Sequence, residues 1–190
     1  MWRAFERGMR SPWAPLLLFT YSFVETVFTL IPIDPFAIAV MVADRTHTYS
    51  IAIYIVLGSL LGASMGYWLG HTALDSWGPT LLGSESAIRT FTHIKEIYLK
   101  HEFLITFTTA FVPIPKTPTI IAAGFLSGNI FVYIVAWALG RTLHFFAEAV
   151  IVRFSFNASL SYGMRALTVG SFLFAVVVAA YIALQYSGIL

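Results

Sequence analysis

Long apolar segments alternate with short polar turns along the whole chain. The stretch 51–70 contains no Asp, Glu, Lys, Arg or His, and neither does the stretch 166–190. A helix that crosses a membrane needs about 20 mainly apolar residues, so both stretches are long enough to span. The pattern predicts an all-helical polytopic membrane protein with about three transmembrane helices.

The order of apolar and polar stretches predicts the elements in turn. After a basic stretch over 1–14 we expect a broken helical hairpin over 15–43 and a continuous helix over 50–74. A second broken hairpin over 103–127 precedes a helix over 130–152, a loop around Asn157 and Ser159, and a last helix over 165–187. Between 84 and 101, apolar residues recur at helical spacing among charged ones, which is typical of a helix on the membrane surface. We expect a single membrane domain over 1–190, with the first hairpin and helix in 15–75 and the second in 103–152.

Prolines interrupt both hairpins inside their apolar runs. The first break contains Pro32 and Pro35, and the second contains Pro113, Pro115 and Pro118. Proline removes a backbone donor, and broken backbone is tolerated at membrane depth only where protein or a cavity surrounds it. Pro115 and Pro118 follow Pro32 and Pro35 at a constant offset of 83 residues. Such weak internal symmetry is typical of transporters whose site lies between two repeats.

Two topologies are compatible with these breaks. If both hairpins span fully, the nine Lys and Arg residues outside the apolar segments divide eight to one between the two sides. If both are re-entrant, the division is six to three, so the positive-inside rule favours full spans. The mid-segment prolines favour re-entrance, because unpaired carbonyls would otherwise face lipid. We prefer two opposed re-entrant hairpins related as an inverted repeat.

Composition supports a membrane protein and excludes several other classes. The chain is 58% hydrophobic and 11% charged, with a mean hydropathy of +0.81, whereas soluble domains are about 25% charged. It contains no cysteine, which excludes disulfides, thiolate metal sites and cysteine nucleophiles. The formal net charge of +2 is too small to indicate nucleic-acid binding.

Four charged residues inside apolar segments are our candidate site residues: Glu25, Asp34, Lys116 and Arg141. Charges at membrane depth are costly and mark substrate or proton pathways. Glu25 suits a proton carrier or a structural carboxyl, and Asp34 either caps a helix or has a functional role. Lys116 supplies the opposite charge in the second hairpin, and the planar fork of Arg141 suits phosphate unless it is a paired structural residue. We expect the acids to neutralise the bases in the empty site, and a phosphate headgroup to displace them.

Glycines favour close helix packing, and no enzyme site is indicated. Gly58, Gly62, Gly66 and Gly70 recur every four residues, a spacing that lets helices approach closely. The five histidines include no i, i+4 pair with an added acid, so we expect no metal site and no cofactor. No serine or threonine has a nucleophile elbow or a partnered base in the sequence, so we expect no catalytic residue and no enzyme activity.

The second break carries a recognisable signature. The run from Phe111 through Pro113 to Lys116 and Thr117, followed by Ala123 and Gly124, resembles the F-x-P-x-x-R-T and A-G signature of the DedA family, also called the SNARE-associated or VTT domain. The N-terminal half agrees more loosely, through Glu25, Pro32, Asp34, Gly62, Gly66, Tyr67 and Gly70. Two positions depart from the family pattern: Lys116 and Ala110 stand where members commonly carry arginine.

The resemblance implies opposed re-entrant hairpins and lipid transport. We expect a flippase or scramblase for an anionic lipid, polyprenyl (undecaprenyl) phosphate or phospholipid, with proton coupling. Alternatives are a proton- or cation-coupled transporter of a small solute, and a non-catalytic membrane scaffold. The expected partners are lipids with phosphate headgroups, protons and a second copy of the chain, with no nucleic acid. The expected location is the bacterial cytoplasmic membrane, with the N-terminus in the cytoplasm.

Overall fold

The computed structural model describes residues 13–28, 32–112, 116–154 and 157–186. Helices make up most of its described part, which contains no strand, and this confirms the all-helical prediction. The helices are α2 (Ala14–Phe28), α3 (Asp34–Ala43), α4 (Thr48–Leu81), α5 (Glu85–Phe111), α6 (Thr117–Phe125), α7 (Ile130–Phe154) and α8 (Asn157–Tyr186).

Three of these helices contain segments long and apolar enough to cross a membrane. The segments are Thr48–Thr80 in α4, Ile130–Phe154 in α7 and Thr168–Gln185 in α8. The apolar helices α2 and α3 contain 15 and 10 residues, or about 22 and 15 Å at 1.5 Å per residue. Each is therefore shorter than the hydrocarbon core of about 30 Å.

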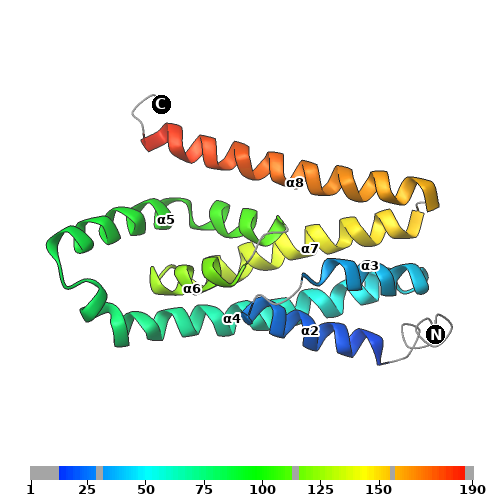
Figure 1. Ribbon diagram of the computed structural model, residues 1–190, viewed down its shortest axis with the longest axis horizontal. Helices are drawn as coiled ribbons and strands as arrows, with labels where there is room; N and C mark the ends of the chain where they lie inside the picture. The colour runs from blue at the N-terminus through cyan, green and yellow to red at the C-terminus, as the bar shows by residue number, and fades with distance from the viewer. Residues whose placement is uncertain (1–12, 29–31, 113–115, 155–156, 187–190) are drawn as a thin grey trace.

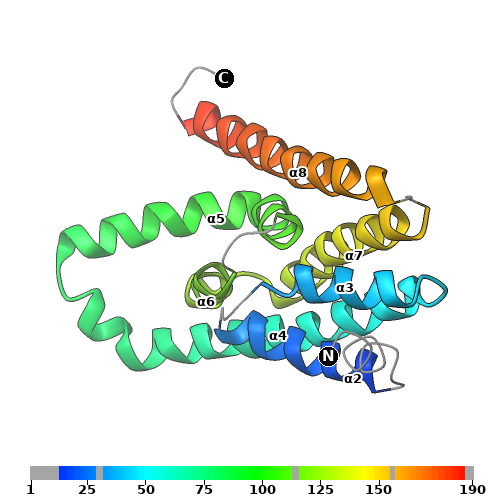
Figure 2. The same cartoon turned by 45° about the vertical axis from the view of Figure 1, so that its right-hand side comes forward.

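Two helical hairpins approach each other from opposite ends of the molecule (Figure 1). Helices α2 and α3 have their outer ends at the right, whereas the second part of α5 and helix α6 form a pair that opens to the left. The view in Figure 2 shows the same arrangement, with α4 and α7 running alongside both hairpins. The inner ends of the two hairpins therefore meet near the middle of the molecule.

Glycines on one face of α4 allow both hairpins to pack closely against it. A Cβ atom on Gly58 or Gly62 would meet the backbone of α2, and one on Gly66 or Gly70 would meet α6. From the other side of the contact, a Cβ on Gly124 would meet the Tyr67 carbonyl. Each of these glycines lies at a helix contact where a larger side chain would force the backbones apart.

Several element boundaries differ from the sequence prediction. The polar section expected as a separate helix over 84–101 is the first part of α5, which continues to Phe111 across a kink at His101 (φ −121°, ψ 20°). Helix α4 extends past 74 to Leu81. Helix α8 begins at Asn157, where a loop was expected. Asn and Ser favour helix starts, so the polar residues interpreted as a loop form the first turn of a helix.

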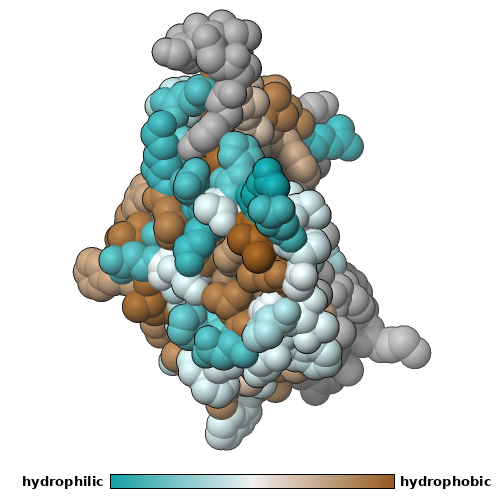
Figure 3. All heavy atoms as spheres, turned by 90° about the vertical axis from the view of Figure 1, so that its left-hand side faces the viewer, coloured by the Kyte–Doolittle hydropathy of each residue, from teal (hydrophilic) through white to brown (hydrophobic). Residues whose placement is uncertain are grey.

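The α4–α5 end of the molecule is amphipathic. Figure 3 views this end and shows hydrophilic and hydrophobic residues mixed over it. Ile88 and Ile94 are exposed there, next to an exposed ion pair between Arg89 and Glu85. Such a mixed surface suits the boundary between lipid headgroups and acyl chains.

Candidate functional site

A buried ion pair joins the inner ends of the two hairpins. Glu25 lies on α2, and Lys116 immediately precedes α6. Lys116 Nζ lies 3.5 Å from Glu25 Oε1, and the two side chains are 2% and 6% exposed. Thr117 Oγ1 also donates to the Thr26 carbonyl at 3.2 Å. These contacts connect residues 91 positions apart in sequence.

A second buried cation lies on α7 beside this ion pair. Arg141 is 1% exposed, and its guanidinium carbon lies 4.3 Å from the centre of the Phe145 ring. The guanidinium is attracted by the carboxylates of Asp34, Glu25 and Glu148 and repelled by the ammonium group of Lys116. Within the described residues, its Nε and Nη2 atoms have no hydrogen-bond acceptor. Arg141 therefore keeps donor capacity for a ligand.

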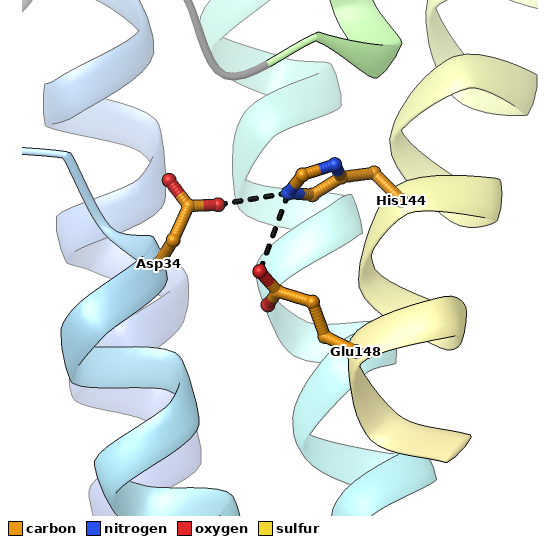
Figure 4. Close-up of side chains that lie close together, drawn as sticks. All are labelled: Asp34, His144 and Glu148. Carbon is orange, nitrogen blue, oxygen red and sulfur yellow. Dashed lines mark hydrogen bonds and ion pairs between the residues drawn. The ribbon is translucent and has the colours of Figure 1, made fainter. Parts of the chain in front are cut away.

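A triad of Asp34, His144 and Glu148 lies between α3 and α7 (Figure 4). His144 Nε2 lies 2.9 Å from Asp34 Oδ1 and 3.4 Å from Glu148 Oε1. The side chains of His144 and Glu148 are 4% and 2% exposed, and that of Asp34 is 16% exposed. Both carboxylates thus converge on a single ring nitrogen.

The triad opens onto a cavity between α3, α7 and α8. The cavity has a volume of about 530 Å³, which is in the size range of small-molecule sites. Residues from all three helices line it, including Pro32, Pro35, Arg165 and Phe172. A ligand in this space would reach Asp34, His144 and Glu148 directly.

The four charged residues selected from the sequence lie in one neighbourhood. Glu25 forms an ion pair with Lys116. The charges of Arg141 and Asp34 lie close enough to interact with Lys116 and with each other. Asp34 is the first residue of α3, and its carboxylate contacts His144 on another helix.

Three of the predicted hairpin-break prolines can be placed. Pro32 and Pro35 line the cavity, and Pro118 lies in the first turn of α6. Pro113 and Pro115 lie outside the described residues.

Sequence reasoning missed His144 and Glu148 as members of this site. A signal was present, because Arg141, His144 and Glu148 follow one another at spacings of three and four within the apolar helix predicted over 130–152. Residues at those spacings lie on one face of a helix. We looked for two histidines at i, i+4 with an added acid. His144 does not fit that pattern, because its partners are two acids: Glu148 on the same helix and Asp34 on α3.

A buried carboxylate in the second hairpin has a structural role. Glu102 Oε2 accepts a hydrogen bond from the Asn129 backbone N–H at 3.0 Å, just before α7 begins. A carboxylate at a helix start satisfies a free amide and complements the helix dipole. Glu102 belongs to α5 and is absent from the triad and from the lining of the cavity.

Comparison with known proteins identifies the family of this arrangement. The family model of the VTT domain matches residues 31–154, more than half of the 190-residue chain. The chain belongs to the VTT-domain family. The matched region includes both hairpin-break segments and the α7 residues of the site. Glu25 lies before its first residue.

One curated relative is an uncharacterised protein of Haemophilus influenzae. It is 23% identical over 128 residues, which cover 67% of this VTT-domain chain and 66% of the relative. The chain thus spans slightly less than two thirds of the relative's length. No solved structure matches the chain.

Proposed function

We propose that this VTT-domain protein is a membrane transporter that moves an anionic lipid between leaflets, with polyprenyl (undecaprenyl) phosphate or a phospholipid as its cargo. Membership of the VTT-domain family and three apolar helices of spanning length support a transport role in a membrane. The observation that carries the lipid assignment is the buried group of Lys116 and Arg141 where the two hairpins meet.

The chemistry of this group suits a phosphate. Arg141 has two nitrogen atoms without acceptors in the described structure, and a guanidinium binds phosphate oxygens through paired hydrogen bonds. Lys116 provides a point charge, which binds phosphate with less geometric restriction than arginine. Glu25 forms an ion pair with Lys116, and a phosphate oxygen would replace the Glu25 carboxylate as the partner of Lys116. This mechanism requires no covalent step, so the proposed activity is not enzymatic.

The membrane arrangement that we propose is a pair of opposed re-entrant hairpins related as an inverted repeat. Support comes from the short helices α2, α3 and α6, and from the opposite directions in which the hairpins open. The N-terminus would lie in the cytoplasm of a bacterium, at the cytoplasmic membrane.

Cysteine accessibility tests this arrangement. The chain contains no cysteine, so single cysteines at Ser84 and Ser127 can be labelled with an impermeant maleimide. Labelling from the same side of the membrane supports re-entrance, whereas labelling from opposite sides would refute it.

Proton coupling is proposed for Glu25. A proton on this carboxyl would release Lys116 for the phosphate, because a neutral acid no longer forms an ion pair. The Glu25→Gln variant mimics the protonated form and should transport lipid without dependence on pH. If its pH profile matches that of the wild type, Glu25 is not the coupling residue.

Lipid transport is tested in vesicles containing the full chain. A fluorescent phosphatidylglycerol or labelled polyprenyl phosphate reports movement between leaflets, with and without a pH gradient. Loss of one charge-assisted contact in Arg141→Gln should slow transport roughly tenfold or more, and Lys116→Ala should also slow it. Arg153→Gln is the matched control, because Arg153 lies at the exposed end of α7 and donates to the Thr46 carbonyl.

The outcomes separate the candidate functions. Lipid movement that is lost in Arg141→Gln and kept in Arg153→Gln supports the lipid transporter. Proton flux without lipid movement would refute it in favour of a coupled transporter of a small solute. A folded protein that moves neither would indicate a membrane scaffold.

A further inference from the structure

The triad of Asp34, His144 and Glu148 has the donor set of a metal centre. Its three candidate ligand atoms are one imidazole nitrogen and two carboxylate oxygens, and all lie within 4.8 Å of one another. We propose that this triad binds a divalent transition-metal ion of the zinc or manganese type. The proposal rests on the ligand atoms of the triad and not on the identity of the proposed lipid cargo.

The hydrogen bonding within the triad supports a bound cation. His144 Nε2 faces both Asp34 and Glu148, yet a ring nitrogen carries one hydrogen at most. Glu148 is 1% exposed, and its Oε2 atom has no hydrogen-bond partner among the described residues. A buried, unpartnered carboxylate oxygen is unfavourable. A metal ion between the three side chains would bind both carboxylates and the ring nitrogen together.

The ligand types select a class of metal. Imidazole together with carboxylates suits zinc, iron and manganese, whereas calcium and magnesium prefer ligand sets made of oxygen alone. Three protein ligands leave coordination positions free, as in catalytic and transport sites. The cavity of about 530 Å³ adjoins all three ligands, so the free positions have room for water or an anion.

The experiment measures metal binding directly. The full chain, purified in detergent with its affinity tag removed and stripped with a chelator, is titrated with ZnCl₂ and MnCl₂ by calorimetry, and its metal content is measured by mass spectrometry. All variants carry His47→Gln, because the exposed Asp44–His47 pair is a second place where zinc can bind. We expect one ion per chain.

Conservative variants locate the ion. Glu148→Gln and Asp34→Asn should each weaken binding at least tenfold, because each removes one charged ligand. Glu102→Gln is the matched control: it neutralises another buried carboxyl, and its amide oxygen can still accept from the Asn129 N–H. The control should bind like the His47→Gln parent.

Two results would overturn the proposal. One is a folded parent protein that binds less than one equivalent of either metal. The other is equal affinity in the parent and in Glu148→Gln. If a variant fails to fold, Co²⁺ is added to the parent protein instead. Coordination by His144 and two carboxylates should give visible absorption bands, which disappear when zinc replaces the cobalt. Absence of these bands would equally refute the site.

Discussion

The ion pair between Glu25 and Lys116 should be strongly coupled. Its atoms are 3.5 Å apart and the side chains are 6% and 2% exposed. With an effective dielectric constant of about 20, the Coulomb attraction at this distance is about 5 kcal/mol. Removal of one partner from a buried pair leaves the other charge uncompensated and costs about 3–5 kcal/mol. We expect Glu25→Gln and Lys116→Met each to destabilise the protein by roughly this amount.

A double-mutant cycle isolates the pairwise interaction. The double variant Glu25→Gln/Lys116→Met removes both charges, so it should be destabilised by at least about 2 kcal/mol less than the sum of the single variants. The free energy of unfolding can be measured by titration with SDS in mixed micelles, followed by tryptophan fluorescence.

A surface pair supplies the control for this cycle. Arg89 and Glu85 are separated by 3.1 Å, and their side chains are 75% and 85% exposed. Exposed i, i+4 pairs contribute only about 0.3–0.5 kcal/mol, so Glu85→Gln/Arg89→Met should show little coupling. A coupling energy for Glu25 and Lys116 no larger than that of the surface pair would refute the reasoning that they form a desolvated contact.

Three further predictions concern stability. Gly124→Ala should destabilise the protein by about 1–3 kcal/mol, because the new Cβ would meet the α4 backbone. Gly170→Ala, in open space on α8, should instead stabilise it by about 0.5–1 kcal/mol. Thermal unfolding in detergent compares the two variants, and equal shifts in unfolding temperature would contradict the α4–α6 packing. Trp137→Phe removes the indole donor to Ser59 Oγ at 3.1 Å and should cost about 1–2 kcal/mol in the same assay; a variant as stable as the wild type would contradict a contribution from this bond. A hydrogen bond from the Thr46 hydroxyl lowers the pKa of Asp44, which is also bonded to the His47 ring. The ionised Asp44 carboxylate should stabilise the protein above about pH 4, and this stabilisation should be lost as the pH falls through the lower pKa of Asp44 in the folded state. An Asp44→Asn variant that loses as much stability as the wild type on acidification would contradict this prediction.

The spanning helices could be predicted because their signal is local. Uninterrupted apolar runs gave the helices observed as α4 and α7, with end shifts of up to seven residues. The start of α8 was wrong because Asn157 and its polar neighbours read equally well as a loop or as a first helical turn. The continuation of α5 through the kink at His101 was also missed, since the polar section and the following apolar section differ in composition and were interpreted as two elements.

Glu25, Asp34, Lys116 and Arg141 were selected because a charge in an apolar run is costly, whereas Glu148, which also lies in an apolar run, was missed. The partners were harder to predict, since pairing depends on which helices pack together. Asp34 could have capped its own helix, but the contact between α3 and α7 brings its carboxylate to His144. Glu148 gave two local signals, its charge inside the apolar helix predicted over 130–152 and its spacing of four from His144. The third member of the triad, Asp34, lies 110 residues from that histidine.

The charge balance of the site links its two proposed ligands. Counted in their ionised forms, the three carboxylates Glu25, Asp34 and Glu148 and the two cations Lys116 and Arg141 give the group one net negative charge when the His144 imidazole is neutral. A buried net charge is unfavourable, and a proton on the imidazole brings the sum to zero. In the proposed metal-bound form with neutral imidazole the sum becomes +1, which one negative charge of a phosphate would cancel. Because binding free energies are linked reciprocally, a cation that favours phosphate binding is itself bound more tightly when phosphate is present.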